Sequence, residues 1–482
     1  MARRFGYLAL HVASTGATAA LIFSAPAFAE RPFLVSACLT AIFAVHFVLA
    51  LRWFPRSGRD GNASNSFGFD AVPHWFVFAA ISLQALFIFA PFYFSDDSVR
   101  HIFDGVYLLR GVDVYTVPPI KLGALHGLMP NHPHLPTVYL PVTQAQAMLG
   151  ALVSERYGFL LVYHLLCALM IAGIFHSANR DERKVFAGLV FSPFFLIASA
   201  SRHADAQGLL LVLLCLLYMR ASFRFRRAAF ALGFLAALLP GLKPEGAIWC
   251  AGLAMLMFFR TPGEVRFRTW SACLAGVAFA VLLQAMFARI FMFPTWASLE
   301  GFRSTAVFFS NWFTAYNPII ALRSGLQPSL ELVIREYRST ALLVLAGILT
   351  VFFIRIAWKA RRNGGGIPAW WASMGDSAPV MLLILLAGVI MSRAVWNPWY
   401  FLWCLPALFL VGRLRIAAGL LVILPLFYLP VIQLRAAGNW DFSTFIPFYF
   451  FATIALLLWI LLTGMGPDPL IRRIWHPDKN HP

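Results

Sequence analysis

Long uninterrupted apolar runs constrain the fold of this chain more than any other feature of its sequence. The run "GFLLVYHLLCALMIAGIF" at residues 158–175 contains no Asp, Glu, Lys or Arg, and similar runs recur along the chain. Inside a bilayer every backbone N–H and C=O group needs a partner within the protein, so a run of this length crosses as a helix. The composition agrees, because 60% of the residues are hydrophobic and only 12% are charged. We therefore expect an all-α integral membrane protein.

The apolar runs predict about 13–14 transmembrane helices. The expected segments are 5–25, 33–52, 73–94, 156–176, 185–201, 206–219, 228–239, 246–259, 269–293, 340–358, 378–394, 399–411, 416–432 and 445–463. Four of them are short for a full crossing, and we expect these to lie behind other helices or to end below one surface. A further apolar stretch, 137–153, holds two glutamines, which favours an amphipathic helix on the outer interface over a span.

Basic residues gather in every second loop between the apolar runs. These loops hold Arg52, Arg56 and Arg59; Arg180, Arg183 and Lys184; Arg220, Arg224, Arg226 and Arg227; Arg260, Arg266 and Arg268; Lys359, Arg361 and Arg362; Arg413 and Arg415; and Arg472 and Arg473. The positive-inside rule assigns them to the cytoplasm, together with both chain ends. This placement accounts for the net charge of +18 without a nucleic-acid partner. The other loops, 95–155, 202–205, 240–245, 294–339, 395–398 and 433–444, are expected to face outward.

Two features of the sequence concern processing and redox chemistry. Arg3 and Arg4 precede an apolar stretch that ends in "AFA" at 27–29, so residues 1–29 are either a cleaved signal peptide or a first helix. We expect a retained helix, because the apolar stretch is longer than a usual signal-peptide core. The six cysteines lie in or beside apolar segments without a paired spacing, and they are expected to be small core residues rather than disulfide or zinc partners.

The stretch "FYFSDDSVRHIFDGVYLLRGVDVY" at 92–115 concentrates charge directly after an apolar run. Asp97, Arg100, His101 and Asp104 are spaced at i, i+3, i+4 and i+7, which places them on one face if the segment is helical. Asp96 and Asp97 also suit a helix N-terminus, where the helix dipole favours carboxylates. An interfacial helix with an internal Asp–Arg pair explains the same residues without any catalytic role.

Other expected outer turns each carry one or two ionisable residues. These are Arg202, His203 and Asp205; Lys243 and Glu245; and Arg393, which precedes the aromatic residues Trp399 and Tyr400. Ionisable residues at a membrane edge are unfavourable unless they are paired or functional, so we expect them to gather around one polar cleft. The simpler interpretation of each residue alone is an interfacial anchor.

A cleft of this composition suits an anionic, lipid-linked substrate. Arg and Lys side chains bind phosphate, and a carboxylate can take the proton of an attacking hydroxyl. Displacing a sugar from a phosphate needs one base and stabilising cations, whereas glycoside hydrolysis uses two carboxylates.

The outer motifs resemble those of GT-C glycosyltransferases, most closely the branch that uses polyprenol-phosphate mannose. "DSVRHIFDG" (97–105) followed by "GVDVY" (111–115) is similar to the family's D-x-x-R-Y-x-W-D-G and G-x-N-P-Y series. "VYLPVTQ", "SPFFLIASASRHADAQGLLLVLL", "LKPEG" and "NPWYFLWCLPAL" resemble further family segments in the same order. The catalytic subunit of GPI mannosyltransferase I has a looser version of the series. The resembling blocks span about two thirds of the chain, from Ser95 to Leu408.

The resemblance implies an inverting transfer of a hexose, with mannose favoured, from a polyprenyl-phosphate sugar to a lipid-linked or cell-envelope glycan acceptor. Asp97 matches the family's key carboxylate and Asp104 its second one, with Asp96 an alternative to Asp97. We expect the substrate-binding residues to be Arg100, His101, Tyr115, Arg202, His203, Asp205, Lys243, Glu245, Arg393, Trp399 and Tyr400. His101 stands where the family has Tyr, Val114 where it has Pro and Leu140 where it has the first Pro of its Y-P-P motif, which leaves donor sugar and acceptor open.

The expected location is the bacterial inner membrane, with the site facing the periplasm. We expect four parts: N-terminal helices and a basic loop (1–72), a catalytic helical core (73–293) that includes outer loop 95–155, an outer loop (294–339), and C-terminal helices with a tail (340–482).

Two alternatives to this interpretation remain open. A transporter or lipid-carrier flippase would have a similar number of spans, but it should place paired charges midway along its helices. A membrane scaffold would explain the basic loops but not the ordered outer motifs. No cofactor is required by the sequence. His126, His132 and His134 could form a divalent-metal site, but they lack the spacing of helical metal ligands, which favours a solvated Pro-rich loop.

Overall fold

The computed structural model describes most of the first 411 residues. The described residues are 2–28, 31, 34–35, 38, 41–42, 74–95, 97–261, 263–311, 330–362, 366–393, 397–411, 416–417, 420–421 and 424. Within these ranges the regular structure is entirely helical, with no strand. The expectations for 43–73, 412–415, 433–444 and 445–463, and for Asp96, lie outside the described residues.

Fifteen α-helices make up the described part of the chain. They are α1 (Ala2–Ser24), α3 (His74–Phe87), α4 (Asp97–Leu109), α5 (Pro141–Val153), α6 (Gly158–Ser177), α7 (Arg180–Val190), α8 (Pro193–Ala200), α9 (Ala204–Ser222), α10 (Arg226–Leu242), α11 (Glu245–Arg260), α12 (Gly263–Phe287), α13 (Trp296–Asn311), α15 (Leu330–Arg362), α16 (Gly366–Met391) and α17 (Leu405–Leu410). Short helical turns are η1 (Ala25–Phe28), η3 (Pro119–Lys121), η4 (Ala288–Met292) and η5 (Pro398–Cys404).

Five of the described helices are long and apolar enough to cross a membrane. They are Gly158–Ser177, Ala204–Ser222, Gly263–Met292, Tyr337–Arg362 and Ser373–Met391. Shorter apolar helices cover Val12–Ala27, Trp75–Phe87 and Pro398–Leu410. The described part of this membrane protein is therefore all-helical, as the apolar runs predict.

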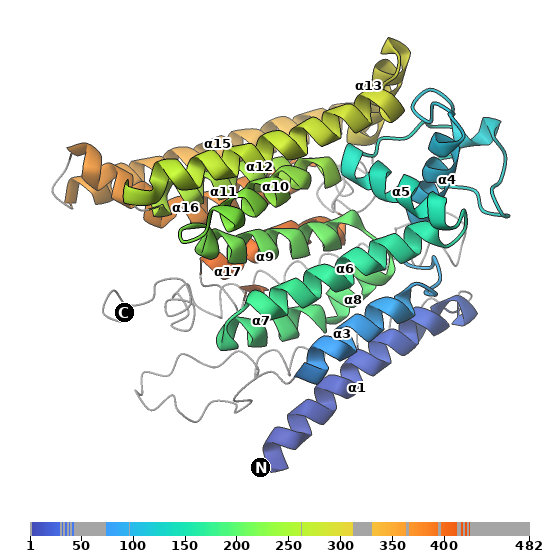
Figure 1. Cartoon of the computed structure of the whole chain (residues 1–482), viewed down its shortest axis with the longest axis horizontal. Coiled ribbons are helices and arrows are strands. Elements are labelled where there is room, and N and C mark those ends of the chain that lie inside the picture. The colour runs from blue at the N-terminus through green and yellow to red at the C-terminus, as the bar shows by residue number, and fades with distance from the viewer. Residues whose placement is uncertain are drawn as a thin grey trace.

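Helices α7 and α8 together cross the bundle once, and α6, this pair, α9, α10, α11 and α12 alternate in direction, so the chain repeatedly returns to the same two ends (Figure 1). We call the end that holds α4, the turn 201–203 and the turn 243–244 the site end. The opposite end, which holds residues 220–227, 260–268 and 359–362, is called the basic end. Figure 1 shows α4 and α5 together at the site end, beyond the long helices. The expected alternation of charged connections is confirmed for these turns.

Two segments fold differently from the expectation. Residues 185–201 were predicted as one span, but α7 ends at Val190 and α8 begins at Pro193. The Ser192 hydroxyl accepts a hydrogen bond from the Phe195 amide (3.2 Å), and a proline at the first helical position favours a new start. The segment 294–339, predicted as a loop, contains α13 and the first turns of α15.

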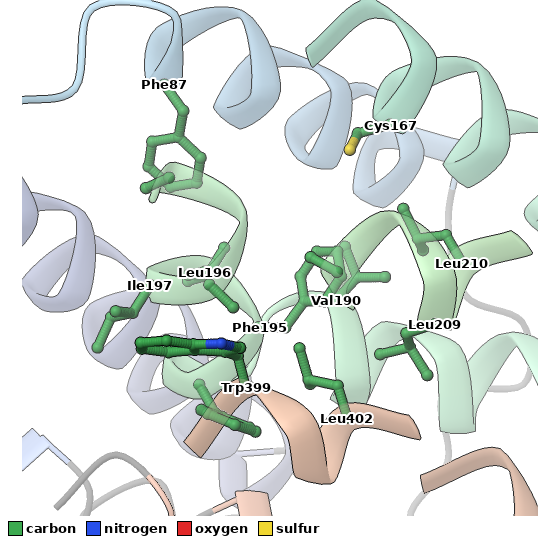
Figure 2. Packing of buried hydrophobic residues seen from close by; sticks show 14 of the residues in the cluster. Phe87, Cys167, Val190, Phe195, Leu196, Ile197, Leu209, Leu210, Trp399 and Leu402 are labelled. Atoms are coloured by element: carbon green, nitrogen blue, oxygen red, sulfur yellow. The ribbon is translucent and has the colours of Figure 1, made fainter. Parts of the chain in front are cut away.

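Helix α8 forms the centre of the largest apolar cluster, and all eight of its residues are buried. Figure 2 shows the neighbourhood of this core, where Trp399 and Leu402 of η5 lie near Leu196 and Ile197. Because lipid is as apolar as these side chains, close van der Waals packing stabilises the core more than exclusion from water does. The same cluster includes Phe87, which precedes the turn that leads to α4.

All six cysteines are unpaired, as predicted.

Candidate functional site

Asp97 opens α4 and is the carboxylate of this helix that solvent reaches. Its side chain is 29% exposed, whereas that of Asp104 is 1% exposed. The Asn131 side-chain amide donates to Asp97 Oδ1 (3.2 Å), and His203 Nδ1 lies 3.7 Å from Asp97 Oδ2. The first-turn position also places this carboxylate at the positive end of the helix dipole. Asp97 is thus oriented from two distant segments of the chain.

The inner face of α4 carries a second, buried polar group. Arg100 Nε lies 3.3 Å from Asp104 Oδ1, and the guanidinium also donates to the backbone carbonyl of Leu135. The Gln144 amide donates to Asp104 Oδ2 (3.0 Å) and links α4 to α5. Gly105 permits this close approach, because a Cβ there would overlap the carbonyl of Ala147. The predicted ion pair within this helix, between Arg100 and Asp104, is confirmed. Both side chains are buried, which favours a structural role for the pair.

Burial shifts the pKa values of Asp104 and His101 on this inner face of α4. Burial raises the pKa of Asp104, although Arg100, Thr137 and Gln144 each act to lower it. Burial, with Lys243 and Arg100 nearby, lowers the pKa of His101 to about 3, so the imidazole is neutral at pH 7. His101 packs against the rings of Tyr139 and Phe159, with centroids 3.9 and 4.8 Å away.

His203 joins α4 to the rest of the site. Its ring stacks on Trp399 with centroids 3.9 Å apart, and Tyr163 donates to its carbonyl (2.7 Å). Burial lowers the pKa of His203 well below its usual range, and Lys243 and His101 lower it further. The contact with Asp97 is therefore made by a neutral imidazole, and it does not count as a salt bridge at neutral pH.

Lys243 and Asp205 form the next ion pair across the site end. Lys243 Nζ lies 3.5 Å from Asp205 Oδ2, and the Trp403 indole donates to Asp205 Oδ1 (2.8 Å). Asp205 is fully buried, while the Lys243 side chain is 19% exposed. Burial alone would lower the pKa of Lys243, but Asp205, Tyr400, Glu245 and Asp97 together raise it. The ammonium group thus stays charged and reachable.

A chain of indole contacts fixes Asp205 in place. The Trp249 indole donates to the Trp403 carbonyl (2.9 Å), and the Trp403 ring lies directly over Gly208 of α9. A Cβ at Gly208 would overlap that ring, so only glycine leaves room for it. Gly208 and Trp249 therefore act on the site through Trp403.

Glu245 and Arg393 form a second ion pair beside the first. Glu245 is buried, whereas the Arg393 side chain is 29% exposed. Arg393 and Lys243 both lie over the ring of Tyr400, at 4.4 and 5.3 Å from its centroid. Two reachable cations thus share one aromatic platform at the site end.

Arg202 and Tyr115, which were also predicted to bind substrate, are fully buried and bonded to backbone carbonyls. Arg202 donates to the carbonyls of Phe87 (2.8 Å) and Ala90 (2.6 Å), which are left unpaired where α3 ends. It adopts a left-handed backbone conformation (φ 57°), which lets the turn before α9 form. The Tyr115 hydroxyl donates to the Tyr139 carbonyl (2.7 Å). Both geometries favour structural roles, because neither side chain is exposed.

The three histidines of the loop before α5 are the candidates for a divalent-metal site. His126 Nε2 lies 3.3 Å from Glu155 Oε2, and Glu155 also pairs with Arg110 (2.7 Å). In the part of the chain that the structure describes, no three His, Cys, Asp or Glu side chains lie close enough to hold a metal ion. A divalent cation at His126, His132 and His134 stays a prediction.

Three residues that contribute hydrogen bonds to the site were not among the predicted site residues: Asn131, Gln144 and Trp403. Each touches a carboxylate from a distant segment. The glutamine carried a weak signal, because an amide in an apolar helix needs a partner. Asn131 lies in a loop and Trp403 in an aromatic cluster, where many other residues have the same local pattern.

No family model, curated protein or solved structure matches the chain.

Proposed function

We propose that this protein is a GT-C-like glycosyltransferase that moves a hexose from a polyprenyl-phosphate donor to a lipid-linked or cell-envelope glycan acceptor. Mannose is the favoured sugar. The observation that carries the proposal is the convergence of one reachable carboxylate, Asp97, with two reachable cations, Lys243 and Arg393. These residues come from segments of the chain nearly 300 positions apart, and His203 and Asp205 join them. The proposal places this site on the periplasmic side of a bacterial inner membrane.

The two cations supply the binding site for the donor phosphate. Lys243 and Arg393 flank Tyr400, and each is already paired with a buried carboxylate that holds its direction. Pre-oriented cations stabilise the charge that grows on the leaving phosphate without reorganising during the reaction. Trp399, stacked on His203, offers an apolar edge for the sugar or the first prenyl unit.

Asp97 is the general base of the proposed reaction. It accepts the proton of the acceptor hydroxyl while that oxygen bonds to the anomeric carbon. The bond between the anomeric carbon and the phosphate oxygen breaks, and polyprenyl phosphate leaves as an anion held by Lys243 and Arg393. A single displacement of this kind inverts the anomeric centre. Asn131 and His203 position Asp97, and Asp104 supports α4 from within.

The position of the ion pairs favours a transferase over a transporter or flippase. A path through the membrane needs polar groups along the length of the helices. In the described ranges the buried pairs of Lys243 with Asp205 and of Arg393 with Glu245 both lie at the site end, and the contact of Asp97 with His203 lies there too.

A transfer assay with purified protein tests the proposal. The full chain is supplied with polyprenyl-phosphate mannose carrying a radiolabelled sugar and with membrane lipid acceptors. We expect Asp97→Asn to lower the rate of label transfer by about 100- to 10,000-fold, the usual contribution of a general base. Glu155→Gln removes an acidic residue that faces Arg110 and His126 instead, and this control should transfer at the wild-type rate.

Label transfer that persists in Asp97→Asn, and in the double variant that adds Asp96→Asn, contradicts the proposed base. Label that crosses the membrane without becoming attached to an acceptor would favour a flippase. Single cysteines at positions 126 and 224 test the orientation, because a membrane-impermeant thiol reagent should reach the first from the periplasm and the second from the cytoplasm.

A further inference from the structure

A cavity of about 750 Å³ opens at the basic end, where α9 turns into α10. Its walls include Tyr218 of the last turn of α9, Arg224 and Phe225 of the connection, and Arg226 and Arg227 of the first turn of α10. All three arginines are exposed. The site end and this cavity lie at opposite ends of α9, which spans about 28 Å at 1.5 Å per residue. That is close to the thickness of the hydrocarbon core, so the cavity lies at the level of the other headgroup layer.

Among the described residues, the positive charge in this cavity has no acidic partner. The guanidinium groups of Arg224, Arg226 and Arg227 make no hydrogen bond or ion pair with the described residues. Glu182, which lies at the same end, is occupied by Arg220 through contacts of 2.6 and 2.7 Å. Three guanidinium groups around one cavity repel one another unless an anion lies between them.

The start of α10 adds to this imbalance. Its N-cap residue, Phe225, offers no side-chain acceptor, so the first amide groups of the helix point toward the cavity end uncapped. Cations are unfavourable at a helix N-terminus and anions are favourable. The positive-inside rule explains arginines anywhere in a cytoplasmic loop, but it does not explain two of them in the first turn of an uncapped helix beside a cavity.

Exposed aromatic rings lie in and beyond the cavity. Phe225 of the cavity wall is 63% exposed, and five residues further along the chain Phe230 is exposed beside Phe279 of α12, with ring centroids 6.2 Å apart. A free phosphate ion has no apolar part that could contact these aromatic rings. A phospholipid does, because its acyl chain can follow the aromatic rings while its phosphate meets the arginines.

We propose that this cavity binds the phosphate of an anionic membrane phospholipid. Arg224, Arg226 and Arg227 hold the phosphodiester, and the open first turn of α10 faces it. The acyl chains lie over Phe225 and Phe230. The proposal is independent of glycosyl transfer, because it involves the opposite end of the molecule.

Lipid titration of the full chain in neutral detergent tests the proposal, with bound lipid counted by native mass spectrometry. The probes are phosphatidylglycerol and phosphatidylcholine with identical chains. The variant Arg224→Gln/Arg226→Gln/Arg227→Gln removes the cavity cations. The control Arg268→Gln/Arg361→Gln/Arg362→Gln removes three exposed arginines from the same end but from outside the cavity.

Wild type and the control should retain one tightly bound phosphatidylglycerol, and the cavity variant should bind it about 100-fold more weakly, since each arginine near an anionic lipid contributes about a factor of five. Equal loss in both triple variants, or equal binding of phosphatidylcholine by wild type, overturns the proposal. Millimolar inorganic phosphate should not displace the lipid, and displacement would identify a free-anion site instead. If the triple variant does not fold, Arg226→Gln alone should weaken binding about five-fold.

Discussion

The two ends of the helical bundle use the same basic residues in opposite ways. At the site end, Lys243 and Arg393 are partly buried, and each is paired with a fully or almost fully buried carboxylate. At the basic end, Lys359 and Asp376 are exposed, and Arg224, Arg226 and Arg227 line an open cavity. Buried pairs hold a fixed geometry because separating them leaves an uncompensated charge, whereas exposed pairs are screened by water. Among these groups, burial rather than residue type distinguishes the two ends, although Glu182 at the basic end is also buried beside Arg220.

The two ends should differ most in how much the free energy of unfolding falls when one acidic partner is removed. Asp205→Asn leaves Lys243 without its partner in a buried setting, and we expect a loss of about 3–5 kcal/mol in the free energy of unfolding. Asp376→Asn at the basic end should change it by about 0–1 kcal/mol. Chemical unfolding in detergent measures both, and similar losses would remove the distinction between the two ends.

Loss of a basic residue should affect donor binding at the site end alone. Lys243→Gln should raise the KM for the polyprenyl-phosphate donor about 10- to 100-fold, because a hydrogen bond to a charged phosphate contributes about 1.5–3 kcal/mol. Lys359→Gln makes the same chemical change at the basic end and should leave KM unaltered. Steady-state label transfer at varied donor concentration gives both values. An unchanged KM in Lys243→Gln would exclude this residue from the phosphate site.

The packing beneath the site end should tolerate an added methyl group less well than the packing elsewhere in the bundle. Gly208→Ala places a methyl group inside the Trp403 ring and should destabilise the protein by about 1–3 kcal/mol while lowering transfer. Gly173→Ala meets only Leu214, at an ordinary 3.5 Å, and serves as the matched control in α6. Restoring room with Gly208→Ala/Trp403→Phe should recover part of the stability but not the transfer rate, because the indole bond to Asp205 is absent. Recovery of full transfer would show that this bond is dispensable.

The last prediction concerns the loss of stability in acid. Burial lowers the pKa of His101 to about 3, against 6.5 in the unfolded chain. Between those values the unfolded chain binds more protons, so the stability present above pH 6.5 is lost progressively as the pH falls toward 3. His203 acts in the same direction, because burial lowers its pKa as well. His101→Phe should therefore flatten the decline in unfolding temperature between pH 7 and pH 4, and an unchanged slope would contradict the burial of a neutral imidazole.

Local patterns in the sequence predicted part of this arrangement. The spacing of Asp97, Arg100, His101 and Asp104 correctly indicated a polar helix face, because side chains three and four positions apart are neighbours on a helix. The sequence also predicted that the charged turns gather around one cleft, because unpaired ionisable residues are unfavourable in a chain this apolar. The Asp97–His203 contact confirms that geometry.

Tertiary contacts account for what the patterns missed. Arg202 resembled a phosphate ligand in the sequence, but the carbonyls that α3 leaves unpaired accept its hydrogen bonds. Trp403 looked like an interfacial anchor, yet its indole holds Asp205. The apolar run at 185–201 predicted a single span, but Ser192 and Pro193 begin a new helix there. Partners more than 100 residues away decided the first two cases.

A cryo-electron microscopy map of the protein with a bound polyprenyl-phosphate sugar tests the central claim most directly. The account predicts the donor phosphate within hydrogen-bond distance of both Lys243 and Arg393, with the anomeric carbon facing the Asp97 carboxylate. A phosphate bound away from Tyr400, or a sugar that Asp97 cannot reach directly or across one acceptor hydroxyl, would contradict it.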